Sequence, residues 1–142
     1  MKNKGFTLVE LLAVIMILGI IMTIAIVSVS QYITSSRNQT YTEHEDTLKR
    51  AAQNYLLDHT DLIPQASGGE TTITGQELYD GDYVRELEDP RSKTNCADEN
   101  SYVIVHRDPD TIDAGKKNFN ANLTYIVCLK CSNTYKSTTC RE

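Results

Sequence analysis

The sequence lacks an excess of positive charge. Its 142 residues include 14 Lys and Arg against 19 Asp and Glu, which gives a formal net charge of −5. The basic residues are scattered rather than clustered, so the sequence does not predict a basic face for nucleic acid. The chain is also too short for two domains, and we expect one small domain on an apolar anchor.

The sequence also lacks a recognisable catalytic motif. Neither His59 nor His106 has a Ser or Cys nucleophile pattern around it. His44 lies beside carboxylates in a predicted helix, which is typical of a solvated surface histidine. The acidic pair Glu86 and Glu88 has no pocket signature near it. The sequence therefore predicts neither an enzyme nor a bound cofactor.

Basic residues are absent between Lys4 and Arg37, and this stretch contains a long apolar run. Residues 11–27 are apolar except for Gly19 and Thr23. With its flanking residues the run is long enough to cross about 30 Å of hydrocarbon. Lysines precede the run and none follows it closely, so the positive-inside rule places the N-terminus in the cytoplasm and the remainder of the chain outside.

Glu10 is a carboxylate inside this apolar run, where an isolated charge is costly. The residues around it read Gly5-Phe6-Thr7-Leu8-Val9-Glu10-Leu11-Leu12, after a stub that contains Lys2 and Lys4. This pattern resembles the class III signal of type IV prepilins and pseudopilins. The resemblance implies a leader peptide of residues 1–5, cleavage between Gly5 and Phe6 by a prepilin peptidase, and N-methylation of Phe6. Unlike an ordinary secretory signal, the apolar helix then stays on the mature protein.

Two roles are open for Glu10. The resemblance implies that its carboxylate pairs with the amine of Phe6 on a neighbouring subunit and sets the register of assembly, since a misplaced subunit leaves both charges unpaired. In an ordinary anchor, Glu10 would instead reach toward the lipid headgroups. The resemblance favours the first role. It implies the membrane, the prepilin peptidase, other pilin subunits and a membrane assembly platform as partners.

The expected fold is α+β and pilin-like: a long N-terminal helix packed on a small C-terminal antiparallel sheet. Residues 6–30 form the transmembrane or fibre-core half, and residues 31–142 form the soluble head. No proline or glycine interrupts residues 20–63, so the helix is expected to continue to about Asp58. Spacings of three, four and seven place seven residues on one face of this helix, namely Tyr41, His44, Leu48, Ala51, Ala52, Tyr55 and Leu56.

Within the head, residues 31–60 complete the helix, residues 61–90 hold a loop and a short helix, and residues 100–140 form a β-meander. Thr74 and Glu77 have the spacing of a capping box, which predicts the start of the short helix. Residues 101–105, 123–129 and 135–139 are the expected strands. Pairing of the first two around their connecting loop places Tyr102 roughly opposite Tyr125.

The four cysteines indicate two disulfides. An exported head lies where disulfides persist, and the sequence has only one close pair, Cys128 and Cys131, where a zinc site usually has two. Redox activity of this CxxC is disfavoured because it falls at a strand end. The expected register brings Cys96 level with Cys131, which favours Cys96–Cys131 with Cys128–Cys140. The pairing Cys96–Cys128 with Cys131–Cys140 stays open.

Two further patterns in the sequence are less specific. Asp108, Asp110 and Asp113 offer three carboxylates in one loop, a calcium candidate that would also need backbone carbonyls and water. A solvated turn is the favoured interpretation. Asn38-Gln39-Thr40 and Asn122-Leu123-Thr124 match the N-glycosylation sequon, and modification is not expected.

The sequence as a whole favours a structural subunit of a type IV pilus or pseudopilus. Many pilins carry a proline where this chain has Val27, and this difference and the compact head favour a minor subunit. Secretion and competence pseudopilins share the same N-terminal pattern. Parts of the sequence look similar to prepilin-like proteins of Gram-positive bacteria. The alternative is a membrane-anchored extracellular binding or adhesin head that does not polymerise.

Overall fold

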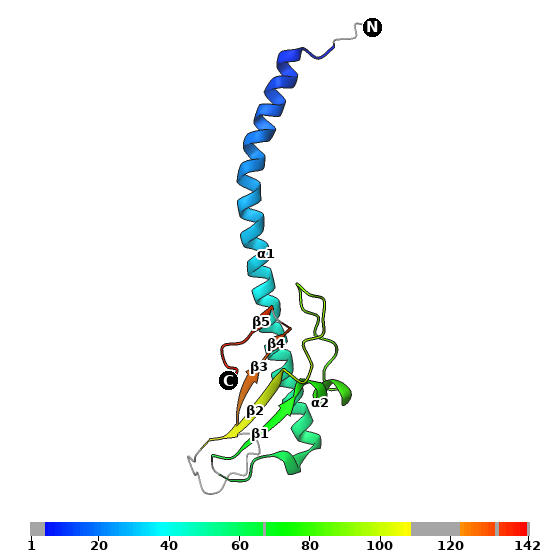
Figure 1. The fold of residues 1–142 in the computed structure, drawn as a ribbon, viewed down its shortest axis with the longest axis vertical. Coiled ribbons are helices and arrows are strands. Elements are labelled where there is room, and N and C mark those ends of the chain that lie inside the picture. The colour runs from blue at the N-terminus through cyan, green and yellow to red at the C-terminus, as the bar shows by residue number, and fades with distance from the viewer. Residues whose placement is uncertain (1–4, 67, 109–122, 133, 142) are drawn as a thin grey trace. The chain divides into compact units, whose positions relative to one another are not determined.

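The computed structural model describes residues 5–66, 68–108, 123–132 and 134–141, without the side chains of residues 25–28. Its first element is the helix α1, Leu8–Asp58 (Figure 1). The helix ends where the sequence predicts, and it continues through Gly19 and Val27 without a break. The chain divides into two compact units, Met1–Asn38 and Gln39–Glu142.

In the first unit, the apolar side chains of α1 are exposed. From Leu8 to Ile24 every described large apolar side chain is at least 48% exposed. By length and composition, α1 is the one helix among the described residues that could cross a membrane. Burial of such a surface needs an apolar environment that this unit does not supply, either lipid or other helices.

In the second unit, the later half of α1 supplies one side of the hydrophobic core. Five of the seven residues predicted to share one face of this helix are buried, and His44 and Tyr55 are half-buried. This part of the helix is therefore amphipathic, as predicted. The core that it joins includes Ile73, Val103, Val105 and Leu129.

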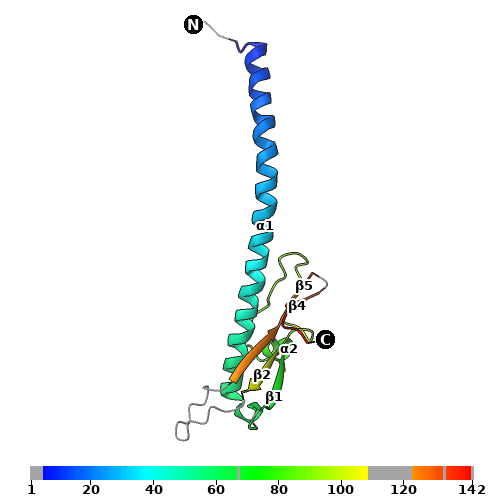
Figure 2. The same cartoon turned by 90° about the vertical axis from the view of Figure 1, so that its left-hand side faces the viewer.

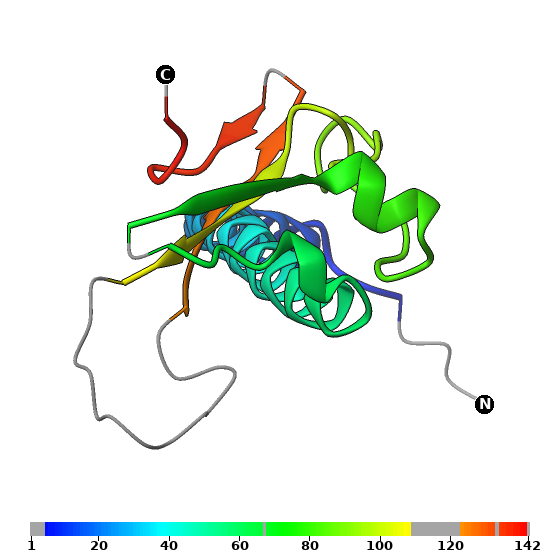
Figure 3. The ribbon, with the colours of Figure 1, turned by 90° about the horizontal axis from the view of Figure 1, so that it is seen from below.

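The sheet of the head has three antiparallel strands in the order β1-β2-β3 (Figure 3). These strands are β1, Glu70–Thr74, β2, Tyr102–Arg107, and β3, Leu123–Cys128. The 3-10 helix η1, Thr60–Leu62, follows α1, and the helix α2, Gly75–Asp80, follows β1. The predicted capping box is confirmed, because the Thr74 hydroxyl accepts a hydrogen bond from the Glu77 amide while the Glu77 carboxylate accepts one from the Thr74 amide.

The predicted set of strands in the C-terminal meander is wrong. Residues 70–74, expected in a loop, form β1 and pair with β2. The expected third strand at residues 135–139 is instead a two-residue strand, β5, Tyr135–Lys136. It pairs with β4, Lys130–Cys131, in a separate two-stranded sheet (Figure 2).

The predicted register between β2 and β3 is wrong by three residues. Tyr102 pairs with Cys128, and Tyr125 pairs with Val105. Because side chains alternate between the two faces of a strand, a shift by an odd number exchanges the faces. The observed register keeps Val103 and Val127 on the core face, whereas the predicted one would place Thr124 there.

Two disulfides close the head, Cys96–Cys131 and Cys128–Cys140. These are the pairs that the sequence analysis placed first, although the register used to reach them is not the observed one. Cys96, Cys131 and Cys128 are buried, and Cys140 is half-buried.

The longer disulfide loop is expected to contribute more to stability. Cys96–Cys131 spans 35 residues and Cys128–Cys140 spans 12. Loop entropy in the unfolded chain gives each bridge about 3 kcal/mol and the longer one roughly 1 kcal/mol more. Unfolding by urea in detergent micelles, followed by near-UV circular dichroism, compares the double variants Cys96→Ser/Cys131→Ser and Cys128→Ser/Cys140→Ser. Greater loss of stability in the second variant would contradict this account.

Candidate functional site

The segment before α1 is open to solvent. Residues 5–7 lie outside the helix, and Phe6 is 87% exposed. A side chain added at Gly5 would meet no atom within 4 Å. The peptide bond between Gly5 and Phe6 is therefore accessible. Lys2 and Lys4 lie outside the described residues.

Glu10 has a hydrogen-bonding partner just before its own helix, which the sequence analysis did not identify. Its Oε2 accepts hydrogen bonds from the backbone amide and the hydroxyl of Thr7, both at 3.0 Å. The amide of Glu10 donates to the Thr7 hydroxyl at 3.3 Å. This is a capping box at the start of α1, and its T-x-x-E spacing is the same signal that identified Thr74 and Glu77.

Because of this capping box, the Glu10 carboxylate is not an isolated charge even in a single, unassembled chain. Its Oε2 is satisfied by two donors, and the N-terminal end of the helix dipole also favours a negative charge there. Since a carboxylate has about four acceptor positions, the side chain keeps capacity for a further donor. The carboxylate can therefore accept a further hydrogen bond beside the start of an exposed apolar helix.

The N-terminal part of the chain is similar to known proteins. Residues 1–26 match the family described as the prokaryotic N-terminal methylation motif. The type IV major fimbrial protein FimA of Dichelobacter nodosus is 33% identical over 97 residues, which cover 67% of this chain and 58% of that protein. The chain belongs to the type IV pilin family.

Two fimbrial proteins of Pseudomonas aeruginosa are each 32% identical to this pilin over 83 residues, which cover 56% of this chain and 54% of each relative. The chain thus spans little more than half the length of these curated relatives. No solved structure matches it.

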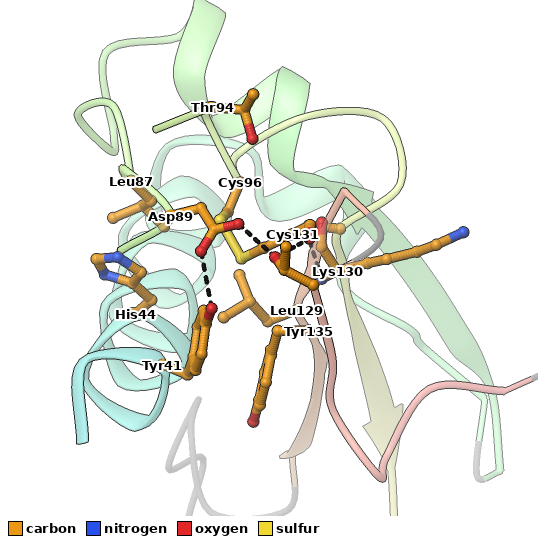
Figure 4. The surroundings of a disulfide bond; sticks show 12 residues. Tyr41, His44, Leu87, Asp89, Thr94, Cys96, Leu129, Lys130, Cys131 and Tyr135 are labelled. Atoms are coloured by element: carbon orange, nitrogen blue, oxygen red, sulfur yellow. Dashed lines mark hydrogen bonds between the residues drawn. A yellow bond between two sulfur atoms is a disulfide. The ribbon is translucent and has the colours of Figure 1, made fainter. Parts of the chain in front are cut away.

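The pilin head contains a buried carboxylate, Asp89, that the sequence analysis did not identify. Asp89 is fully buried and accepts hydrogen bonds from the Tyr41 hydroxyl at 2.7 Å, the Ser92 hydroxyl at 2.5 Å, the Arg91 amide at 2.9 Å and the Thr134 hydroxyl. Figure 4 shows it beside the Cys96–Cys131 disulfide. Asp89 therefore joins α1, its own loop and the turn between β4 and β5.

At Asp89, the hydrogen bonds together change the pKa of the carboxylate more than burial does. Burial alone would raise the pKa of Asp89, but the bonds from Ser92, Thr134, Arg91 and Tyr41 hold it well below its usual range. The neighbouring Tyr135 stacks on Tyr41 with ring centroids 4.0 Å apart. Burial, together with its hydrogen bond to Glu45, raises the pKa of Tyr135 to about 12, so both rings stay neutral at physiological pH.

Replacing Asp89 with alanine is expected to destabilise the head by roughly 3 kcal/mol, because it leaves several buried donors without an acceptor. The folded-state pKa is lowered, so the contribution of Asp89 is present above its unfolded pKa of about 4 and is lost as pH falls below it. Urea unfolding at neutral and acidic pH should show the difference from wild type shrinking in acid. Asp46→Ala, at an exposed position of α1, is the control. A difference independent of pH would contradict a role for the charged form.

The calcium candidate is only partly described. Asp108 accepts a hydrogen bond from the Thr124 hydroxyl at 2.7 Å and lies 4.0 Å from His106, whereas Asp110 and Asp113 lie outside the described residues. Within the ranges that the structure covers, no three His, Cys, Asp or Glu side chains are placed to hold a metal ion. Asn122 of the second sequon also lies outside them.

Proposed function

We propose that this pilin is a structural subunit of a type IV pilus. The observation that supports it best is the matched N-terminal motif, which leads into a helix whose apolar side chains are exposed and which carries one carboxylate at its start. A membrane buries such a helix before assembly, and the helices of neighbouring subunits bury it in a fibre. The fimbrial relatives agree with this function.

In this proposal, a prepilin peptidase cuts between Gly5 and Phe6, Phe6 is N-methylated, and Glu10 then pairs with the amine of Phe6 on an adjacent subunit. The exposed Gly5–Phe6 bond and the remaining acceptor capacity of Glu10 support these steps. In an apolar surrounding, two unpaired charges are costly and a hydrogen-bonded pair is much less so. The pair therefore selects the register in which subunits add to the fibre.

The orientation follows from the charges near the helix. Lys2 and Lys4 hold the N-terminus in the cytoplasm, and the disulfide-linked head lies outside the cell. Val27, in place of the proline found in many pilins, supports a minor rather than a major subunit. The remaining partner is the membrane assembly platform that adds subunits to the fibre.

The experiment that tests the proposal is the intact mass and N-terminal sequence of the protein from membranes and from a sheared surface fraction. We expect a chain that begins at methylated Phe6, with a mass four hydrogens below that of the reduced chain, in both fractions. An intact Met1 in membranes and no protein in the sheared fraction would overturn it and favour an anchored head that does not polymerise.

A further inference from the structure

The two edges of the three-stranded sheet differ. At one edge, β1 contains the charged Glu70, and the Thr71 hydroxyl donates to the Leu62 carbonyl at 2.7 Å. At the other edge, β3 has the sequence LTYIVC, with no charge, proline or glycine. Proteins usually protect edge strands with charges, prolines or a covering segment, since exposed backbone groups can pair with another chain.

Only the end of β3 is covered by the described part of the chain. The Thr139 hydroxyl donates to the Val127 carbonyl, and Ser137 bonds Leu129 just beyond the strand. Among the described residues, no hydrogen bond reaches the outer edge of residues 123–126. We use "open edge" for these four residues. Their uncharged, β-prone sequence is the kind that readily accepts another strand.

A groove of about 530 Å³ lies along the open edge. One wall is formed by Leu123, Thr124 and Tyr125. Because consecutive residues of a strand point to opposite faces of the sheet, the groove runs beside the strand rather than over one face. The other wall is one side of α1, which contributes Lys49, Gln53, Asn54 and Leu57. The volume is in the range of protein ligand pockets.

The side chains in the groove indicate what fits there. Leu57, which is 56% exposed, and the partly buried Leu123 both line the groove, and we call these two apolar side chains its floor. Lys49 makes no ion pair with any residue that the structure describes, and it gives the groove a positively charged side chain. A complementary partner is an extended peptide with an apolar side chain for the floor and a carboxylate for Lys49.

We propose that the open edge and its groove bind an extended acidic segment of another protein, which adds to the sheet as a fourth strand. Main-chain hydrogen bonds to residues 123–126 would supply affinity, and the floor and Lys49 would supply selectivity. The described part of this chain has no spare segment of that kind. Residues 84–88 are acidic and outside the regular elements, but Val84 and Leu87 are buried in the head's own core.

The test uses the full mature chain in detergent micelles and a phage-displayed library of random heptapeptides as the probe. Enriched peptides should carry a carboxylate and alternating apolar residues. As synthetic peptides they should slow hydrogen exchange at residues 123–126. Lys49→Glu should weaken their binding by about tenfold, whereas Lys130→Glu, at an exposed position of β4, should leave it unchanged.

Methylation of alternate backbone nitrogens in the peptide provides a second control, because it removes the donors that a fourth strand needs. Undiminished binding by the methylated peptides would overturn the proposal, as would a failure to enrich peptides or insensitivity to Lys49→Glu. Exchange protection of residues 123–126 that rises with protein concentration alone would show that a second copy occupies the edge, which also overturns it. Processing at Gly5 and recovery in sheared fibres are read separately, so these outcomes leave the proposed function untouched.

Discussion

Replacing Gly5 with tryptophan is expected to abolish processing. In the proposed processing step, the peptidase must accept the residues on both sides of the bond that it cuts, and a bulky indole next to that bond would prevent productive binding. The pilin itself should tolerate the change, since a side chain at Gly5 would meet no atom within 4 Å. Loss of cleavage would therefore report recognition by the peptidase and not misfolding. The measurement is the intact mass of the membrane form, which should retain residues 1–5 and an unmethylated Phe6.

Gly19→Ala is the matched control for this variant. Gly19 also has no atom within 4 Å of an added side chain, but it lies inside α1, far along the chain from the cleaved bond. We expect the control to be processed to the same extent as the wild type. A product that begins at Phe6 in Gly5→Trp would show that the cleavage site is elsewhere.

The long helix was predictable because its signals are local. The absence of proline and glycine from residues 20–63 and the spacing of Tyr41, Leu48 and Leu56 define its extent and its buried face. The box at Thr74 and Glu77 was found from four consecutive residues. The identical spacing at Thr7 and Glu10 is an equally local signal for the capping box that starts α1.

The features that were missed depend on contacts distant in sequence. β1 is rich in threonine and becomes a strand only by pairing with β2, some 30 residues away. The register between β2 and β3 depends on which face of β3 meets the core. The prediction that Tyr102 lies opposite Tyr125 did not take this face into account. Asp89 appears as a turn residue because it precedes a proline, and only the folded head brings Tyr41 and Thr134 to its carboxylate.

Glu10→Val is expected to leave the pilin processed and in the membrane but to reduce its incorporation into fibres by at least about tenfold. Valine suits lipid better than a carboxylate does, so anchoring should not suffer. In the proposed assembly, the variant loses the partner of the Phe6 amine, which would then enter the fibre core as an unpaired charge. A tenfold effect needs only about 1.4 kcal/mol, less than the usual cost of an unpaired buried charge. The measurement is the ratio of processed protein in sheared and membrane fractions, determined by immunoblot.

Two further variants separate the charge of Glu10 from its place in the capping box. Glu10→Gln keeps an acceptor for the Thr7 amide and hydroxyl but removes the charge, so it should assemble as poorly as Glu10→Val. Thr7→Val removes the hydroxyl that caps the helix but keeps the charge, and the lost cap costs about 1 kcal/mol of helix stability. It should therefore retain most of its assembly. If Thr7→Val assembled as poorly as Glu10→Val while Glu10→Gln assembled normally, the carboxylate would act by starting the helix, and pairing with Phe6 would not set the register.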